Sequence, residues 1–139
     1  MNTSGTQGYT ISISNRTYGT LVLNADASPG EVKTYTGTGS NPLPINGDLQ
    51  IGIGVTVKMD LATANGNIHI AGSYIQNGGV FNLPSGPDNR IMKIKGDLTQ
   101  LAGGSIIEPS SGLHAIELNG ISQQNVFYRE RFQTISHSK

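Results

Sequence analysis

The chain has 139 residues, enough for one domain with a core of its own, and its formal net charge is zero. Its nine Lys and Arg residues are scattered, whereas a phosphate backbone is bound through clustered cations, so we expect no nucleic-acid partner. No apolar run approaches the ~20 residues of a membrane-spanning helix, and the lack of cysteine excludes disulfides and thiolate metal sites.

The predicted elements are short β-strands separated by glycine and proline. In chain order, apolar and polar residues alternate in YTISIS (9–14), TLVLN (20–24) and QIGIGVTVKM (50–59). This period of two is typical of half-buried strands. No window of twelve or more residues keeps a helical period, so the sequence predicts an all-β protein.

From residue 68 onward one sequence motif occurs twice. IHIAGSYIQNGGVFNLP (68–84) and MKIKGDLTQLAGGSIIEP (92–109) agree in their apolar residues, glycines, glutamine and closing proline. Their anchor, Ile or Leu followed by any residue and Gly, ends at Gly47, Gly72, Gly96 and Gly120, so the period is close to 24. A looser copy begins near Tyr18. A leucine-rich repeat would need a fixed Leu spacing and a helical segment, whereas three short strands and three turns fit a β-solenoid coil.

We therefore predict a parallel β-helix of about five coils, right-handed, with coils stacked at ~4.8 Å. Residues 1–17 are expected to cap its N-terminal end, 18–124 to form the coils, and 125–139 to form a C-terminal cap or tail. A β-sandwich or jelly roll is the alternative architecture, but it gives no reason for a 24-residue register.

The register predicts which side chains face the core. The inward columns are Leu43, Ile68, Met92 and Ile116, and Ile45, Ile70, Ile94 and Leu118. The outward columns are Pro44, His69, Lys93 and Glu117, and Asn46, Ala71, Lys95 and Asn119. Gln76, Gln100 and Gln124 are also predicted to align, each four residues after its glycine.

The repeated sequence motifs resemble those of large secreted bacterial proteins. NGDLQIGIGVTVKMDL (46–61), KGDLTQLAGGSIIEPSSG (95–112) and IELNGISQQNV (116–126) are similar to the "G-D/N-L-T" and "G-G-T-I/F" units of their β-helical regions. The resemblance covers roughly 18–126. It implies a secreted or cell-surface protein in which this module is joined to a catalytic or surface domain. Some carbohydrate-binding modules of xylan-degrading systems are similar, so the resemblance implies a polysaccharide partner.

The predicted function is a non-catalytic module that binds a plant cell-wall polysaccharide, a xylan-like chain, and needs no cofactor. Sugar rings stack on aromatic faces and bond to amides. The candidate carbohydrate-binding residues are Tyr74, Gln76, Asn77, Phe81, Gln100 and Tyr35. A core role competes for several of them: Tyr74 aligns with Leu49 and Leu98, Phe81 aligns with Ile106, and the glutamines could stack as a structural ladder.

Two other functions stay open: a spacer or adhesin segment without a ligand, and a small polysaccharide lyase or hydrolase. Hydrolysis needs two placed carboxylates. Asp48 and Asp97 share a repeat position two coils apart, ~10 Å, but turn chemistry beside glycine is the competing role. Asp88-Asn89-Arg90 is the only local candidate for a calcium-assisted lyase. The three His residues, at 69, 114 and 137, lack the spacing of metal ligands.

Overall fold

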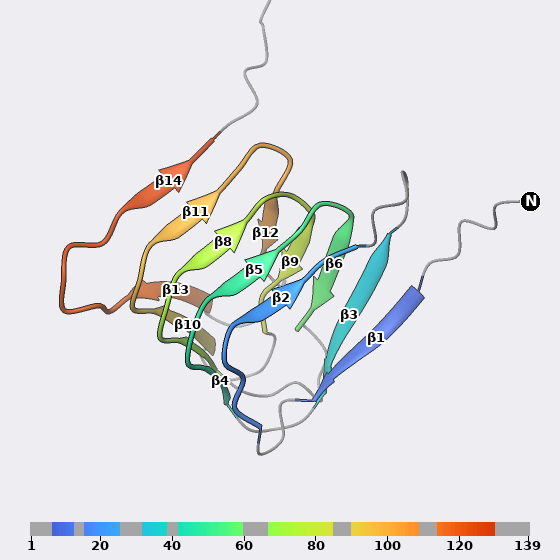
Figure 1. Cartoon of the computed structure of the whole chain (residues 1–139), viewed down its shortest axis with the longest axis horizontal. Helices are drawn as coiled ribbons and strands as arrows, with labels where there is room; N and C mark the ends of the chain where they lie inside the picture. The colour runs from blue at the N-terminus through green and yellow to red at the C-terminus, as the bar shows by residue number, and fades with distance from the viewer. Residues whose placement is uncertain are drawn as a thin grey trace, which may run out of the picture.

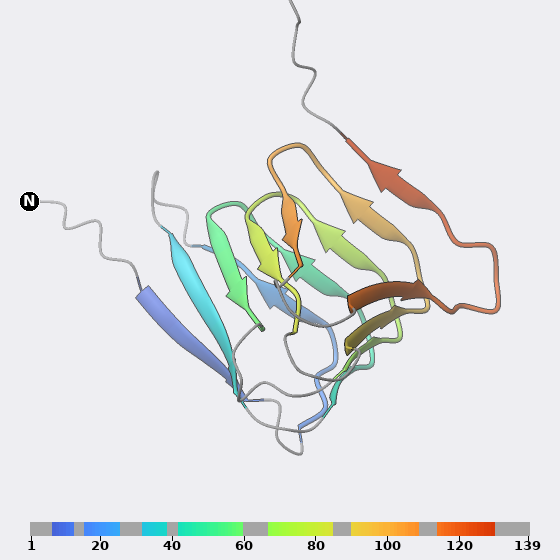
Figure 2. The same ribbon diagram turned by 180° about the vertical axis from the view of Figure 1, so that it is seen from behind.

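The structure is a computed structural model, and it describes residues 7–12, 16–25, 32–38, 42–59, 67–84, 90–108 and 114–129. These residues form β-strands, turns and loops, and no helix occurs among them. The strands make three parallel sheets, named here A, B and C, as Figures 1 and 2 show from opposite sides. Sheet A contains β1 (Gln7–Ser12), β3 (Lys33–Thr38), β6 (Val55–Lys58), β9 (Val80–Asn82) and β12 (Ser105–Ile107). Sheet B contains β4 (Leu43–Ile45), β7 (Ile68–Ile70), β10 (Arg90–Ile94) and β13 (His114–Leu118). Sheet C contains β2 (Leu21–Leu23), β5 (Leu49–Ile51), β8 (Tyr74–Gln76), β11 (Leu98–Gln100) and β14 (Val126–Tyr128).

The chain winds through the sheets in the order B, C, A, and each circuit is one coil of a parallel β-solenoid. The coils β4–β5–β6, β7–β8–β9 and β10–β11–β12 are complete, and partial coils flank them. The predicted fold class is therefore confirmed, with about four turns rather than the five expected. Figures 1 and 2 agree that β1 and β14 lie at opposite ends of the stack.

The predicted register is present in sheet B. Leu43 pairs with Ile68, Ile68 with Met92 and Met92 with Ile116, each in parallel. The looser copy near Tyr18 is also a coil, because Tyr18 bridges to Ile45 and Leu21 pairs with Leu49. Period and register could be predicted together because each coil repeats the same strand–bend–strand order.

The inward columns form one continuous core. In the three complete coils their members are buried. These residues are Leu43, Ile45, Ile68, Ile70, Met92 and Ile94. At the last coil Ile116 is half-buried and Leu118 is exposed, since no described coil covers them. Burial thus follows the period-two alternation wherever a coil lies between two others.

The last coil departs from the predicted alignment. Leu98 pairs with Val126 and Gln100 with Tyr128, 28 residues apart, whereas Leu98 and Tyr74 are 24 apart. Four extra residues therefore lie in the bend between β13 and β14. Gln124 leaves the predicted glutamine column and fills this bend: its Oε1 accepts from Gly120 N (2.7 Å) and its Nε2 donates to Ile94 O (3.0 Å).

Strands extend into both segments that were predicted as caps. β1 pairs with β3 along its whole length, and β14 pairs with β11. Both are strand positions of the stack rather than covers laid across it. The charged tail after Arg129 lies outside the described residues.

Glycine is required at the bend between sheets B and C because successive coils touch there. A Cβ on Gly72 would lie 2.7 Å from the carbonyl carbon of Gly47, and one on Gly96 would lie 2.7 Å from that of Gly72. The same residues continue the coil-to-coil bonding, with Gly72 N donating to Gly47 O at 2.9 Å. At the next corner Gly79 has φ of 72°, a left-handed conformation that favours glycine.

A candidate ligand groove on sheet B

The structure buries four of the six predicted carbohydrate-binding residues. Tyr74 and Gln76 are 0% exposed, Phe81 is 1% exposed and Gln100 is 8% exposed. The Tyr74 and Phe81 rings pack edge to face, with centroids 5.8 Å apart. A buried ring offers no face to a sugar, so the predicted surface of rings and amides does not form and these four residues belong to the core.

Gln76 is held by a buried hydrogen-bond network. The Tyr74 hydroxyl donates to Gln76 Oε1 (3.1 Å), and Gln76 Nε2 donates to Gly79 O and Ser105 O (both 3.1 Å). Gln100 Nε2 likewise donates to Gly104 O at 2.9 Å. Burial raises the pKa of the Tyr74 hydroxyl well above its ordinary value, so the phenol stays neutral. The glutamines thus close corners of the solenoid through bonds to main-chain carbonyls, which is a structural role but not the side-chain ladder that was expected.

The other two predicted residues lie apart from the groove described below. Tyr35 is half-buried; its ring stacks on Tyr9, with centroids 5.3 Å apart, and its hydroxyl donates to Asn24 O (2.9 Å). Asn77 is exposed, just after β8. None of the six predicted residues lines the groove.

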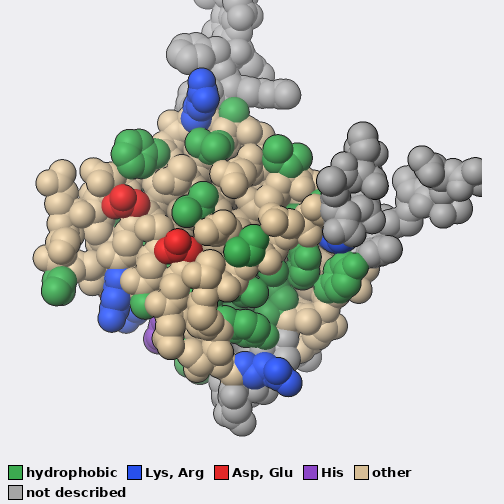
Figure 3. Space-filling view, viewed as in Figure 1, with side chains coloured by type: hydrophobic (Ala, Val, Ile, Leu, Met, Phe, Trp, Pro, Cys, Tyr) green, Lys and Arg blue, Asp and Glu red, His purple; other side chains and the backbone are tan. Residues whose placement is uncertain are grey.

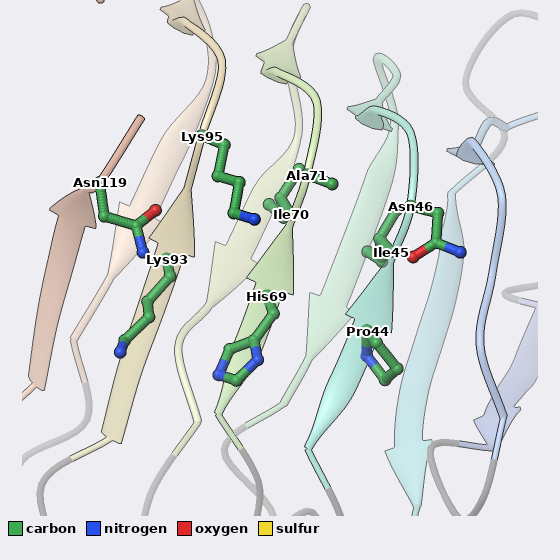
Figure 4. Close-up of a pocket in the computed structure, with 9 residues that line it drawn as sticks. All are labelled: Pro44, Ile45, Asn46, His69, Ile70, Ala71, Lys93, Lys95 and Asn119. Atoms are coloured by element: carbon green, nitrogen blue, oxygen red, sulfur yellow. The ribbon is translucent and has the colours of Figure 1, made fainter. Parts of the chain in front are cut away.

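The groove crosses the outer surface of sheet B and has a volume of about 350 Å³ (Figure 4). Two parallel rows of outward residues line it, one from the strands and one from the bends that follow them. The strand row is Pro44, His69 and Lys93, and the bend row is Asn46, Ala71, Lys95 and Asn119. Ile45 and Ile70 complete the lining; their side chains are buried, so main-chain atoms form that part of the floor.

The solenoid builds the groove by repeating one geometry. Pro44 pairs with His69 and His69 with Lys93, so the row advances one residue per coil, ~4.8 Å. The groove therefore runs along the stack and across the strands. The sequence predicted the outward direction of both rows, but no motif indicated that the space between them forms a groove.

The lining carries positive charge and no carboxylate. Lys93 is half-buried, Lys95 is exposed, and neither forms an ion pair with an acid of the described chain. Glu117 is the register neighbour of Lys93 on β13 but lies outside the lining. In Figure 4 the Lys95 side chain extends toward β7, which carries His69, whereas the Lys93 side chain extends to the opposite side of β10.

Asn119 contributes an unsatisfied acceptor at the same end of the groove. Its Oδ1 is buried and has no hydrogen-bond partner among the described residues. Leaving such an atom unpaired costs about 1–3 kcal/mol. A ligand that brings a hydroxyl or another donor to this amide would recover part of that cost.

The acids that were considered for hydrolysis have structural partners. Asp48 Oδ1 accepts from Ser73 N (2.8 Å), Ser73 Oγ from Asp97 N (3.0 Å), and Asp97 Oδ1 from Asn125 N (2.8 Å). Each side chain thus caps a backbone N–H in the next coil, so the aspartates are structural, but through bonds between coils rather than the local turn chemistry that was predicted. Asp88, Asn89 and His137 lie outside the described residues, as do the side chains of Arg90 and His114. No cluster of three metal-ligating residues occurs in the described part of the chain.

The outer face of sheet C offers no comparable concentration of charge. Figure 3 shows a surface of mainly uncharged atoms with scattered apolar side chains, two separate acidic side chains, and Lys or Arg side chains at several separate points around its outline. Val22 and Phe127 are exposed on this face, at opposite ends of the sheet. The groove on sheet B is therefore the stronger candidate for ligand binding.

Fold and groove together define a parallel β-solenoid with a polar, cationic groove along one face. Comparisons with protein-family models, with curated proteins and with solved structures gave no match. No helix in the described ranges is long and apolar enough to cross a membrane.

Proposed function

We propose that the chain is a non-catalytic module that binds a plant cell-wall polysaccharide, a xylan-like chain, as part of a larger secreted or surface protein. The observation that carries the proposal is the groove, which runs along the stack between two rows of regularly spaced side chains. Two coils advance ~10 Å, which matches the disaccharide repeat of an extended glycan. Successive disaccharides would therefore meet equivalent positions.

The lining favours hydrogen bonding over ring stacking. It contains the amides of Asn46 and Asn119, the imidazole of His69 and two lysine ammonium groups, but no Tyr, Phe or Trp. Glycan hydroxyls donate to and accept from such groups. At about 350 Å³ the groove is near the lower limit for small-ligand sites, so it suits one or two sugar rings of a single soluble chain.

We assign the groove no catalytic step because hydrolysis needs a placed pair of carboxylates, and none lines it. A spacer or adhesin segment remains the second candidate. It is favoured by β14, whose three residues are all exposed and whose outer edge pairs with no other described strand.

Affinity electrophoresis against a panel of soluble polysaccharides tests the proposal. Ala71 lies in the middle of the bend row, so Ala71→Tyr should fill the groove and abolish retardation, while Ala102→Tyr, at an exposed turn outside it, should not. If no polysaccharide retards the wild type, the spacer function is favoured. Release of reducing ends or unsaturated products from any substrate would contradict the non-catalytic assignment.

A further inference from the structure

Positive charge in the groove is concentrated at one end. Lys93 and Lys95 both come from β10 and the residue after it, and Asn119 lies one coil further on. Toward β4 the lining becomes neutral, with Ala71, Pro44 and Asn46. A ligand lying along the stack would meet two ammonium groups at one end and uncharged groups at the other.

Neither lysine forms an ion pair with an acid of the described chain. The carboxylates of Asp48 and Asp97 accept backbone N–H groups of neighbouring coils. Glu117, on the coil next to Lys93, forms no ion pair with it in the structure. Lys93 lies in β10 and Lys95 follows that strand directly, at the start of the bend, so both lysines reach the groove from the same coil. A carboxylate that reaches either ammonium group can accept a charge-assisted hydrogen bond from it.

We propose that the groove selects an acidic polysaccharide and that Lys93 and Lys95 bind its uronate carboxylates. This inference rests on the proposed polysaccharide-binding function and adds the substrate class. The neutral part of the groove, from His69 to Asn46, holds an adjoining uncharged ring. The matching ligand is a neutral glycan backbone that carries uronate groups.

The test uses one glycan in two forms: a glucuronoxylan, and the same preparation with its uronate carboxyls reduced to alcohols. The wild type should bind the acidic form about tenfold more tightly, and added salt should narrow the difference because it screens exposed charges. Lys93→Gln/Lys95→Gln should bind both forms equally. Lys58→Gln removes an exposed lysine on β6, outside the groove, and should behave as the wild type. Urea unfolding of each variant confirms that it is folded.

Each outcome separates the two proposals. Equal binding of both forms by the wild type overturns the acidic-ligand inference while the polysaccharide-binding function stands. Binding of neither form, nor of any other polysaccharide in the panel, overturns the function itself. If Lys58→Gln weakens binding as much as the double variant does, the attraction is that of the whole surface, and the assignment to Lys93 and Lys95 is wrong.

Discussion

The Tyr74 hydroxyl and the Gln76 amide depend on each other for stability. The losses of stability caused by removing each one separately should add up to more than the loss caused by removing both together. Tyr74→Phe leaves the buried Oε1 of Gln76 without its donor, and Gln76→Leu leaves the buried Tyr74 hydroxyl without its acceptor. An orphaned buried polar group costs about 1–3 kcal/mol, so each single variant should lose stability in that range.

The double variant Tyr74→Phe/Gln76→Leu removes both polar groups from an apolar column. The preceding coil already has Ile51 at the position that pairs with Gln76. The Gly79 carbonyl also keeps a donor, Ser105 N at 2.9 Å. The Ser105 carbonyl loses Gln76 Nε2 in Gln76→Leu and in the double variant alike, so this loss cancels in the coupling energy. We expect the double variant to be no less stable than the worse single variant, with a coupling energy of about 1–2 kcal/mol.

Urea unfolding followed by circular dichroism measures all four proteins, and the electrophoresis assay is run on the same samples. Additive losses within about 0.5 kcal/mol would refute the shared buried bond. Unchanged stability combined with loss of polysaccharide binding in Gln76→Leu would refute the burial argument and return Gln76 to the binding site.

Three further predictions follow from the core and the bends. The folded-state pKa of Tyr74 lies above its unfolded value of about 10, so its contribution to stability is complete below pH ~10 and is lost above it. The free energy of unfolding should therefore fall by about 1.4 kcal/mol per pH unit above pH ~10. In Tyr74→Phe this part of the fall should be absent when unfolding is measured at alkaline pH. Gly72→Ala forces a Cβ against the Gly47 backbone and should cost at least about 2 kcal/mol in urea unfolding. Gly19→Ala, where a Cβ has open space, should cost less than about 1 kcal/mol. Equal losses in the two variants would show that coil spacing does not depend on Gly72. Asp48→Ala should cost about 1 kcal/mol through the lost cap on Ser73 N while Asp48→Asn keeps an acceptor there, and both should bind polysaccharide as the wild type does; loss of binding in Asp48→Asn would instead place this carboxylate at the ligand.

The fold could be predicted in detail because, in a solenoid with coils of equal length, residues one period apart in the sequence pair in space. Ile68 and Met92 are equivalent in sequence and pair in space, since each coil has the same length as its neighbour. The prediction failed where that equality ends: the longer bend before β14 moves Gln124 out of the glutamine column. A residue count cannot show in which corner extra residues are accommodated.

The predicted site failed for a different reason. Tyr74 and Gln76 were predicted to bind a ligand because they differ from the residues at the same positions of other coils. Both occupy inward positions, however, and at such a position the side chain is buried whatever its type. Their aligned neighbours, Leu49 and Ile51, carried that signal. The groove was missed because none of its residues is unusual alone; it forms in the space between the strand row and the bend row, which alignment does not express.

Because the two groove rows advance by one residue per coil, duplication of the sequence that encodes a coil would change the length of ligand that the groove can hold. One added coil would extend the groove by ~4.8 Å and supply one more residue to each row without altering existing contacts. Two added coils would accommodate a further disaccharide. Under the proposed function, added coils would lengthen the bound glycan in discrete steps, and the two outward positions of each coil would determine which substituents along the glycan are recognised.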